Sequence, residues 1–297
     1  MGTSSHTSPW TLADLPPQRG RTVLITGAGS GIGLETTRAL ASAGAHVVLA
    51  VRNTDGAREA VAGVPGSTEV LPLDLADLAS VRRFAGAWDR PLDILINNAG
   101  VANIPLRRTA DGFEPHLGTN HLGHFALTNL LLPRVTDRVV TVASNAHKQA
   151  VLDLDDPNWE RRPYRASAAY GQSKLANLLF TLELQRRLAG AGSPLLAVAA
   201  HPGAASTGLN RHLGPAMSLV ASTVGRLISQ SGPAGALLTL FAATQDLAGA
   251  SYVGPDGRGE QRGHPVPVGR SAAARDEALA GKLWELSERL TSTSFPL

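Results

Sequence analysis

The chain has 297 residues, of which 43% are hydrophobic and 17% charged, so it can form one large folded domain or two small ones. This composition excludes a disordered chain. Cysteine is absent, which excludes a disulfide framework, thiolate zinc sites, iron–sulfur ligation and cysteine nucleophiles.

The charge balance needs a closer look. An isoelectric point of about 9.7 is typical of nucleic-acid binders, yet the formal net charge is only +3. The chain has three lysines and three tyrosines, so little titrates between pH 7 and 10 and a small positive charge persists to high pH. Because no Lys/Arg-rich run is present, we expect no nucleic-acid partner.

The first 20 residues are rich in Ser, Thr and Pro and predict an N-terminal arm over 1–20. They lack the basic start and apolar core of a secretory signal. Apolar stretches such as Gly232 to Thr244 are shorter than the roughly 20 residues that a membrane span requires. We therefore expect a cytoplasmic protein without a membrane span.

From residue 21 onward, short apolar segments alternate with amphipathic ones. Apolar runs predict strands over Arg21–Thr26, His46–Val51, Thr68–Pro72, Leu92–Asn97, Arg138–Ser144 and Leu195–His201. Helices are predicted over Gly31–Ala43, Asp55–Ala62, Asp77–Trp88, Gly112–Leu132, Ala168–Ala189, Pro215–Ser229, Gly232–Gln245 and Ala272–Thr291.

The strands are apolar throughout, which indicates that both of their faces are buried. Strands separated by helices give right-handed crossovers and a parallel sheet. We predict an α/β fold: a single doubly wound Rossmann-type domain over 21–297, with a parallel sheet of about seven strands and helices on both faces.

A glycine-rich loop, TGAGSGIG over residues 26–33, joins the first strand to the first helix. It fits the spacing T-G-x-x-x-G-x-G rather than G-x-G-x-x-G. Glycine permits positive φ and removes the Cβ that would block a pyrophosphate, and the helix amides then face the phosphates. A tight turn without a ligand is the alternative, but the strand–helix context favours dinucleotide binding by Gly27, Ser30, Gly31, Ile32 and Gly33.

The second strand ends at Val51-Arg52-Asn53. An acidic residue here would hold the ribose 2′-hydroxyl and favour NAD, but none is present. The Arg52 guanidinium suits a 2′-phosphate, so we predict NADP(H) in preference to NAD(H), with Asn53 beside it. A solvated arginine at a strand end is the alternative.

Tyr170 and Lys174 stand four residues apart at the start of a predicted long helix and share one face of it. An ammonium beside a phenol favours the phenolate and lowers the phenol pKa from its reference value near 10. A tyrosine tuned in this way can protonate a carbonyl oxygen or deprotonate an alcohol. A surface pair without a function is the alternative.

Taken with further motifs in order, these features mean that the sequence resembles the short-chain dehydrogenase/reductase superfamily over about residues 21–291. The segment Asn120-His121-Leu122-Gly123-His124-Phe125 and the tail Arg275-Asp276-Glu277-Ala278 resemble its retinol dehydrogenase and WW-domain oxidoreductase branch, without a WW domain. The bias toward arginine and the high alanine content indicate a GC-rich bacterial genome. The supporting motifs are Asp74-Leu75, Asn97-Asn98-Ala99-Gly100, Asn120, Ser144, Tyr170/Lys174, and His201-Pro202-Gly203 with Thr207.

The resemblance implies a role for each matching residue. Tyr170 would be the general acid/base, Lys174 would lower its pKa and bind the nicotinamide ribose, Ser144 would bond the substrate oxygen, and Asn120 would hold a water linked to Lys174. Ala143 stands where a second serine is common. The implied cofactor contacts are Asp74 and Leu75 at the adenine, Asn98, Ala99 and Gly100 along the cofactor, and Pro202, Gly203 and Thr207 at the nicotinamide end.

Other features carry two interpretations. His116, His121, His124 and His147 suggest a metal, but no completing carboxylate or second pair is evident, so we predict no metal site. The segment Asp153 to Arg165 is interpreted as a solvated loop, with an active-site flap as the alternative. Residues 204–230 follow the sixth strand and predict a substrate-loop region, whose apolar residues are either a substrate wall or helix core.

We therefore predict an NADP(H)-dependent oxidoreductase that interconverts an alcohol and a ketone or aldehyde, acting on a small, hydrophobic substrate. A dinucleotide-binding regulator or scaffold with little turnover is the alternative from another class, and a reductase of carbon–carbon double bonds is a third. Both a homodimer and a monomer remain open, because the helices carrying Asn120 and Tyr170 form subunit contacts in many relatives.

Overall fold

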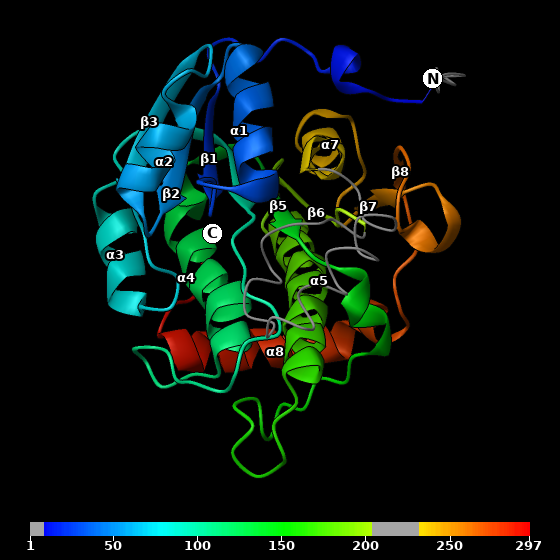
Figure 1. The fold of residues 1–297 in the computed structure, drawn as a ribbon. Coiled ribbons are helices and arrows are strands. Elements are labelled where there is room, and N and C mark those ends of the chain that lie inside the picture. The colour runs from blue at the N-terminus through cyan, green and yellow to red at the C-terminus, as the bar shows by residue number, and fades with distance from the viewer. Residues whose placement is uncertain (1–8, 204–231) are drawn as a thin grey trace, which may run out of the picture.

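The computed structural model describes residues 9–203 and 232–297, which form a doubly wound α/β domain (Figure 1). Its sheet has eight strands in the order β3-β2-β1-β4-β5-β6-β7-β8. Strands β1 to β7 pair in parallel, and β8 pairs with β7 in the antiparallel sense. Their bounds are β1 Thr22–Thr26, β2 His46–Val51, β3 Ser67–Pro72, β4 Leu92–Asn97, β5 Val135–Val142, β6 Leu196–Ala200, β7 Tyr252–Pro255 and β8 Pro265–Pro267.

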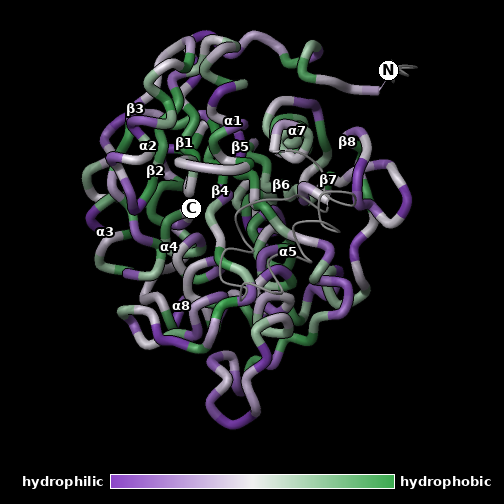
Figure 2. Tube along the Cα trace, in the orientation of Figure 1, coloured by the Kyte–Doolittle hydropathy of each residue, from purple (hydrophilic) through white to green (hydrophobic). Residues whose placement is uncertain are grey.

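Helices cover both faces of this sheet (Figure 1). One face carries α1 (Gly31–Ser42), α2 (Thr54–Val61) and α7 (Gly232–Thr244). The other carries α3 (Leu78–Gly86), α4 (Gly123–Leu131), α5 (Ala166–Gly190) and α8 (Glu277–Thr291). Each face has its own apolar cluster, and the hydrophobic residues gather along the central strands in Figure 2.

The predicted fold class is confirmed, with differences at the sheet edges. All six predicted strands are present, but β7 and β8 were not recognised because they are short and contain Gly and Pro. The prediction that strands are buried on both faces is wrong for β3, whose residues are exposed or half-buried. Among the strands of the described residues, β3 lies at the edge of the sheet and pairs only with β2.

Two predicted helices differ in form. The helix expected over 112–132 begins at Pro115 and contains a π-helical segment, Leu117–Leu122, before α4. The last helix is preceded by a separate 3₁₀ turn, Ala273–Arg275, and Asp276 caps α8 by accepting a hydrogen bond from the Leu279 amide. The predicted helix over 215–229 lies outside the described residues.

Helix α8 packs against α5 and α4 and crosses both of them in Figure 1. Its Trp284 is fully buried and stacks on Phe180 of α5, with ring centroids 5.7 Å apart, and meets the Phe125 ring of α4 edge-on at 4.8 Å. The chain's own C-terminal helix therefore covers part of the surface of α4 and α5. The sequence resemblance suggests these two helices as a subunit contact.

The described part of the N-terminal arm is anchored. Trp10 meets the ring of Phe241 in α7 edge-on at 5.4 Å, and the Gln18 amide donates to the Ala43 carbonyl at 2.8 Å. Among residues 9–203 and 232–297, no helix is long and apolar enough to cross a membrane.

Candidate active site

A cavity of about 950 Å³ opens at the carboxyl ends of the central strands. The strand order reverses between β1 and β4, which is where doubly wound sheets bind ligands. The cavity brings together most of the residues predicted from the sequence: Gly27, Ser30, Gly31, Ile32, Gly33, Arg52, Asn53, Asp74, Leu75, Asn98, Ala99, Gly100, Tyr170, Lys174 and Pro202. The structure describes Gly203. Thr207 and the predicted substrate loop 204–230 lie outside the described residues.

The glycine loop is built for close approach. Gly27 and Gly31 have φ of +65° and +56°, the region that favours glycine. A Cβ on Gly33 would lie 2.5 Å from Asn98 Nδ2 and 2.9 Å from the Gly27 carbonyl oxygen, so only glycine lets α1 begin this close to β1. Ser30 is exposed and its hydroxyl makes no capping bond to α1. The N-terminus of α1 thus lines the cavity without a side-chain cap, an arrangement that suits a dinucleotide phosphate.

The ends of β2 and β3 form the adjoining part of the cavity. Arg52 is exposed and directly follows β2, and Asn53 caps α2 by accepting a hydrogen bond from the Gly56 amide at 3.1 Å. Asp74 Oδ1 accepts from the Ala76 amide at 2.9 Å, and Leu75 beside it is buried. No acidic side chain occupies the end of β2, which agrees with the feature that predicted NADP(H).

A buried chain of hydrogen bonds links the glycine loop to Asn120. The Thr26 hydroxyl oxygen accepts from the amides of Asn98 and Ala99, each at 3.0 Å. His124 lies between this hydroxyl, 2.8 Å from Nε2, and the Asn120 carbonyl, 3.0 Å from Nδ1. Burial lowers the pKa of His124 to about 4, so the ring is neutral near pH 7 and can accept at one nitrogen while donating at the other.

Asn120 lies inside the π-helical segment and is fully buried behind Gly100. Its Oδ1 accepts from the Val101 amide at 2.8 Å, and its Nδ2 donates to the Val101 carbonyl at 3.0 Å and to Ser173 Oγ at 2.9 Å. π-bulges in helices are frequent at functional sites. The segment therefore presents Asn120 to the loop that follows β4.

Tyr170 and Lys174 line the cavity from the first turns of α5. Burial raises the pKa of Tyr170, and a hydrogen bond with the Ser144 side chain only partly offsets this. The direction is opposite to the predicted lowering, because burial outweighs the Ser144 hydrogen bond. Ser144 Oγ also accepts from the Ala146 amide at 3.2 Å, at the start of a 3₁₀ turn.

The Lys174 side chain is buried, and Nζ donates to the Val142 carbonyl at 2.9 Å and lies 5.8 Å from the centre of the Tyr170 ring. Burial lowers the pKa of Lys174 to about 8. A buried ammonium with one protein acceptor keeps donors available, which suits the hydroxyl groups of a ribose.

Residues 201–203, which directly follow β6, contact the segment between β7 and β8, and sequence patterns gave no reason to expect this contact. His201 Nδ1 accepts from the Gly203 amide at 3.3 Å, and its Nε2 lies 3.1 Å from Glu260 Oε2. Glu260 also bonds Lys148 Nζ at 2.8 Å and has φ of +55°, which is uncommon outside glycine. Glu260 thus connects the Pro202-Gly203 wall with the turn that follows Ser144.

The four histidines considered as metal ligands bond other protein groups instead. His116 bonds Glu114, His121 bonds Ser287, and His147 bonds the Ser144 carbonyl. Among the described residues, no three His, Cys, Asp or Glu side chains form a group that could hold a metal.

The interpretation of residues 153–165 as a solvated loop is wrong for its inner side. Trp159 is buried beneath the Arg162 guanidinium, which lies 3.9 Å from the ring centre. Tyr164 is half-buried and donates to the Ile104 carbonyl at 3.0 Å. Large aromatic residues within a charged stretch were the available signal for this packing.

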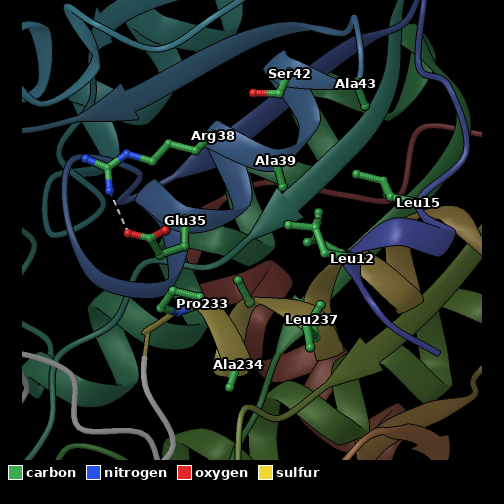
Figure 3. Close-up of a pocket in the computed structure, with 12 residues that line it drawn as sticks. Leu12, Leu15, Glu35, Arg38, Ala39, Ser42, Ala43, Pro233, Ala234 and Leu237 are labelled. Carbon is green, nitrogen blue, oxygen red and sulfur yellow. Dashed lines mark hydrogen bonds and ion pairs between the residues drawn. The ribbon is translucent and has the colours of Figure 1, made fainter. Parts of the chain in front are cut away.

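A second, apolar cavity of about 580 Å³ lies between α1, α7 and the N-terminal 3₁₀ turn (Figure 3). Leu12, Leu15 and Leu237 line it, and the Arg38–Glu35 ion pair lies at its edge. None of the residues predicted to act in catalysis or cofactor binding lines this cavity.

Comparison with known proteins agrees with this architecture. The family model described as short chain dehydrogenase matches residues 21–218. Human retinol dehydrogenase 13 is 40% identical over 294 residues, which cover 93% of this chain and 86% of that protein. Mouse polyprenol dehydrogenase is 41% identical over 296 residues, which cover 93% and 85% of the two chains.

Two solved structures are similar over most of the chain. An uncharacterised protein from Mycobacterium paratuberculosis is 53% identical with a TM-score of 0.86, covering 98% of this chain and all of that one. Pseudomonas aeruginosa RhlG, solved as an active-site complex with NADP, is 25% identical with a TM-score of 0.63, covering 79% and 94%.

The chain therefore belongs to the short-chain dehydrogenase/reductase family, in the branch that contains the retinol dehydrogenases. It is an oxidoreductase of the class that acts on CH–OH and carbonyl groups.

Proposed function

We propose that this enzyme interconverts an alcohol and a ketone or aldehyde with NADP(H), using Tyr170 as the general acid/base. The observation that carries the proposal is the lining of the main cavity. One continuous surface unites the glycine loop, Arg52 at the end of β2, and the Tyr170–Lys174 pair of α5. A dinucleotide site and a proton donor thus share one cavity.

The fit to a nicotinamide dinucleotide rests on the cradle that a Cβ at Gly33 would fill and on the N-terminus of α1, which lines the cavity. The glycine loop would hold the phosphates, Arg52 the 2′-phosphate, and Asp74 and Leu75 the adenine end. Asn98, Ala99 and Gly100 would lie along the cofactor, with Lys174 at the ribose and Pro202 and Gly203 at the nicotinamide end. When bound, the nicotinamide supplies or accepts the hydride.

Tyr170 would handle the proton. Because burial raises its pKa, the phenol is protonated near pH 7 and can donate to a carbonyl oxygen during reduction. In oxidation it must first lose that proton, and the Ser144 hydrogen bond assists because it favours the phenolate. Ser144 would also bond the substrate oxygen, and Asn120 would hold the loop after β4 beside the reacting centre.

The names of the relatives support an alcohol or carbonyl on a hydrophobic molecule as the substrate class. The cytoplasmic location and the bacterial source are predictions from the sequence.

Cofactor choice is tested through Arg52. Replacing Arg52 with Ala removes the predicted 2′-phosphate contact, so the Kd for NADPH should rise by at least about tenfold while the Kd for NADH changes by less than about twofold. Fluorescence titration of both cofactors measures this. Equal weakening of the two would contradict the 2′-phosphate role. Arg58→Ala on α2, whose guanidinium pairs with Asp55 at 2.8 Å, is a matched surface control.

A further inference from the structure

A buried polar network lies beside the active site and has no part in the mechanism above. The side chains of Glu114 and His116 are fully buried, and Glu114 Oε1 lies 2.6 Å from His116 Nδ1. The Tyr164 hydroxyl lies 3.1 Å from each of these two atoms. We call Glu114, His116 and Tyr164 the buried triad. Burying such groups is costly unless every one is bonded, so their placement demands a specific arrangement.

Glu114 is well supplied with donors. Its Oε2 accepts from the Leu117 amide at 2.7 Å, at the start of the π-helical segment that carries Asn120. Burial alone would raise the pKa of Glu114, but His116 and the surrounding amides outweigh it and lower that pKa. Glu114 is therefore an ionised acceptor, and His116 Nδ1 donates to it. In the neutral tautomer of His116, Nε2 is then the accepting nitrogen.

The triad holds Ile104 at both of its backbone polar atoms. The Ile104 amide lies 3.5 Å from His116 Nε2, a long hydrogen bond. The single proton of the Tyr164 hydroxyl is shared between the Ile104 carbonyl at 3.0 Å and Glu114 Oε1 at 3.1 Å. Ile104 lines the main cavity together with Tyr170. The residue before it, Asn103, has φ of +52°, so the chain turns sharply just before it.

The same stretch of chain is held in the same way at its other end. Asn120 bonds both the amide and the carbonyl of Val101, at 2.8 and 3.0 Å. The wall formed by Val101, Ala102 and Ile104 is thus apolar in its side chains and fixed in its backbone. An apolar, rigid wall selects by size, because it cannot adapt to a larger group or hydrogen-bond a polar one.

The triad also contacts the reacting end of the cavity. The His116 ring meets the Tyr170 ring edge-on, with centroids 6.1 Å apart. A side chain that touches Tyr170 on one side and the Ile104 amide on the other sets the distance between the proton donor and the wall.

We propose that Ile104 determines which apolar substituent of the alcohol or carbonyl substrate is accepted, and that the buried triad is the positioning device that fixes Ile104 relative to Tyr170. This inference rests on the proposed function, which it deepens by naming a specificity residue.

The test uses straight-chain aldehydes of increasing length with NADPH. In Ile104→Ala, the ratio of kcat/KM for long over short aldehydes should change by about tenfold or more, while the KM for NADPH stays within about twofold. Tyr164→Phe keeps the ring and removes the hydroxyl that holds the Ile104 carbonyl. It should change the same ratio about threefold to tenfold, chiefly through the KM of the aldehyde.

Tyr252→Phe is the matched control, because its buried hydroxyl has no hydrogen-bond partner among the described residues. It should leave the ratio unchanged. A change in stability alone would lower the rates for all aldehydes equally, so a uniform loss, or an unchanged ratio in Ile104→Ala, would overturn the proposal.

Equilibrium binding of the same aldehydes in the presence of NADP⁺ separates two kinds of failure. In one outcome, the parent enzyme binds the aldehydes but does not turn them over, and Ile104→Ala changes which chain length binds best. That outcome supports the role of Ile104 in the wall and contradicts the proposed reaction. Turnover with the same length preference in parent and variant contradicts the wall and leaves the proposed reaction standing.

Discussion

The two halves of the cavity are built in different ways. On the cofactor side, β1, the glycine loop and α1 follow one another in the chain, and the decisive feature is the absence of a Cβ at Gly27 and Gly33. On the substrate side, the wall depends on side-chain bonds between distant segments, such as Tyr164 with Ile104 and Asn120 with Val101. The first half is local backbone geometry, and the second is a set of long-range contacts.

This difference predicts that substitutions on the two sides have different effects on stability, cofactor binding and turnover. The largest effect is expected at Lys174, where both halves meet. Lys174→Met should lower turnover by about a hundredfold or more, because it removes a positive charge and a donor beside Tyr170. Asn177 Nδ2, 3.3 Å from the Val142 carbonyl, still satisfies that acceptor in the variant.

The same substitution should stabilise the folded state. Burial lowers the pKa of Lys174 from 10.5 to about 8, so the unfolded chain binds this proton more tightly between those values. The charged, buried Lys174 therefore lowers the free energy of unfolding by about 3 kcal/mol below about pH 8, and this loss disappears as pH rises to 10.5. Denaturant unfolding of both proteins at pH 7 and pH 10.5 should show a gain for Lys174→Met that disappears at the higher pH. Equal free energies of unfolding of the parent enzyme and Lys174→Met at pH 7 would contradict this cost of burying the charged lysine.

On the cofactor side, Gly33→Ala is expected to act through the backbone. The new Cβ would meet Asn98 Nδ2 at 2.5 Å and the Gly27 carbonyl at 2.9 Å, and the carbonyl belongs to main chain that cannot move aside. The free energy of unfolding should fall by about 1–3 kcal/mol and NADPH binding should weaken at least about tenfold.

Gly86→Ala in α3 is the control for that variant, because a Cβ there meets nothing within 4 Å. It should be neutral or slightly stabilising in denaturant unfolding. If Gly33→Ala binds NADPH as tightly as the parent enzyme does, the close approach of α1 to β1 is not needed for cofactor binding.

The smallest effect is expected where His201, Pro202 and Gly203 follow β6. Glu260→Gly removes the carboxylate that joins His201 and Lys148, and it relieves the unfavourable φ of +55°. The KM for NADPH should rise about fivefold with little change in stability. Ala250→Gly, at φ of +59°, relieves similar strain without removing a contact to these residues, and its KM should not change. If the KM for NADPH is unaltered in Glu260→Gly, Glu260 does not position the residues that follow β6.

The sequence allowed prediction of the fold, the glycine loop and the Tyr170–Lys174 pair because each depends on residues close together in the chain. The strand at His46–Val51 was placed without error for the same reason. The Ile104 wall could not be predicted, since nothing local pairs Tyr164 with Glu114, 50 residues earlier. The raised pKa of Tyr170 was also missed, because burial depends on the whole fold and outweighs the Ser144 hydrogen bond.

The central claim is that Tyr170 moves the proton in a cavity that also binds NADP(H). Tyr170→Phe tests it most directly, with NADPH affinity and aldehyde reduction measured on the same protein. The account predicts that turnover falls about a hundredfold or more while the Kd for NADPH stays within about twofold, since the ring remains and only the hydroxyl is lost. Turnover close to that of the parent enzyme, with NADPH still bound, would contradict it.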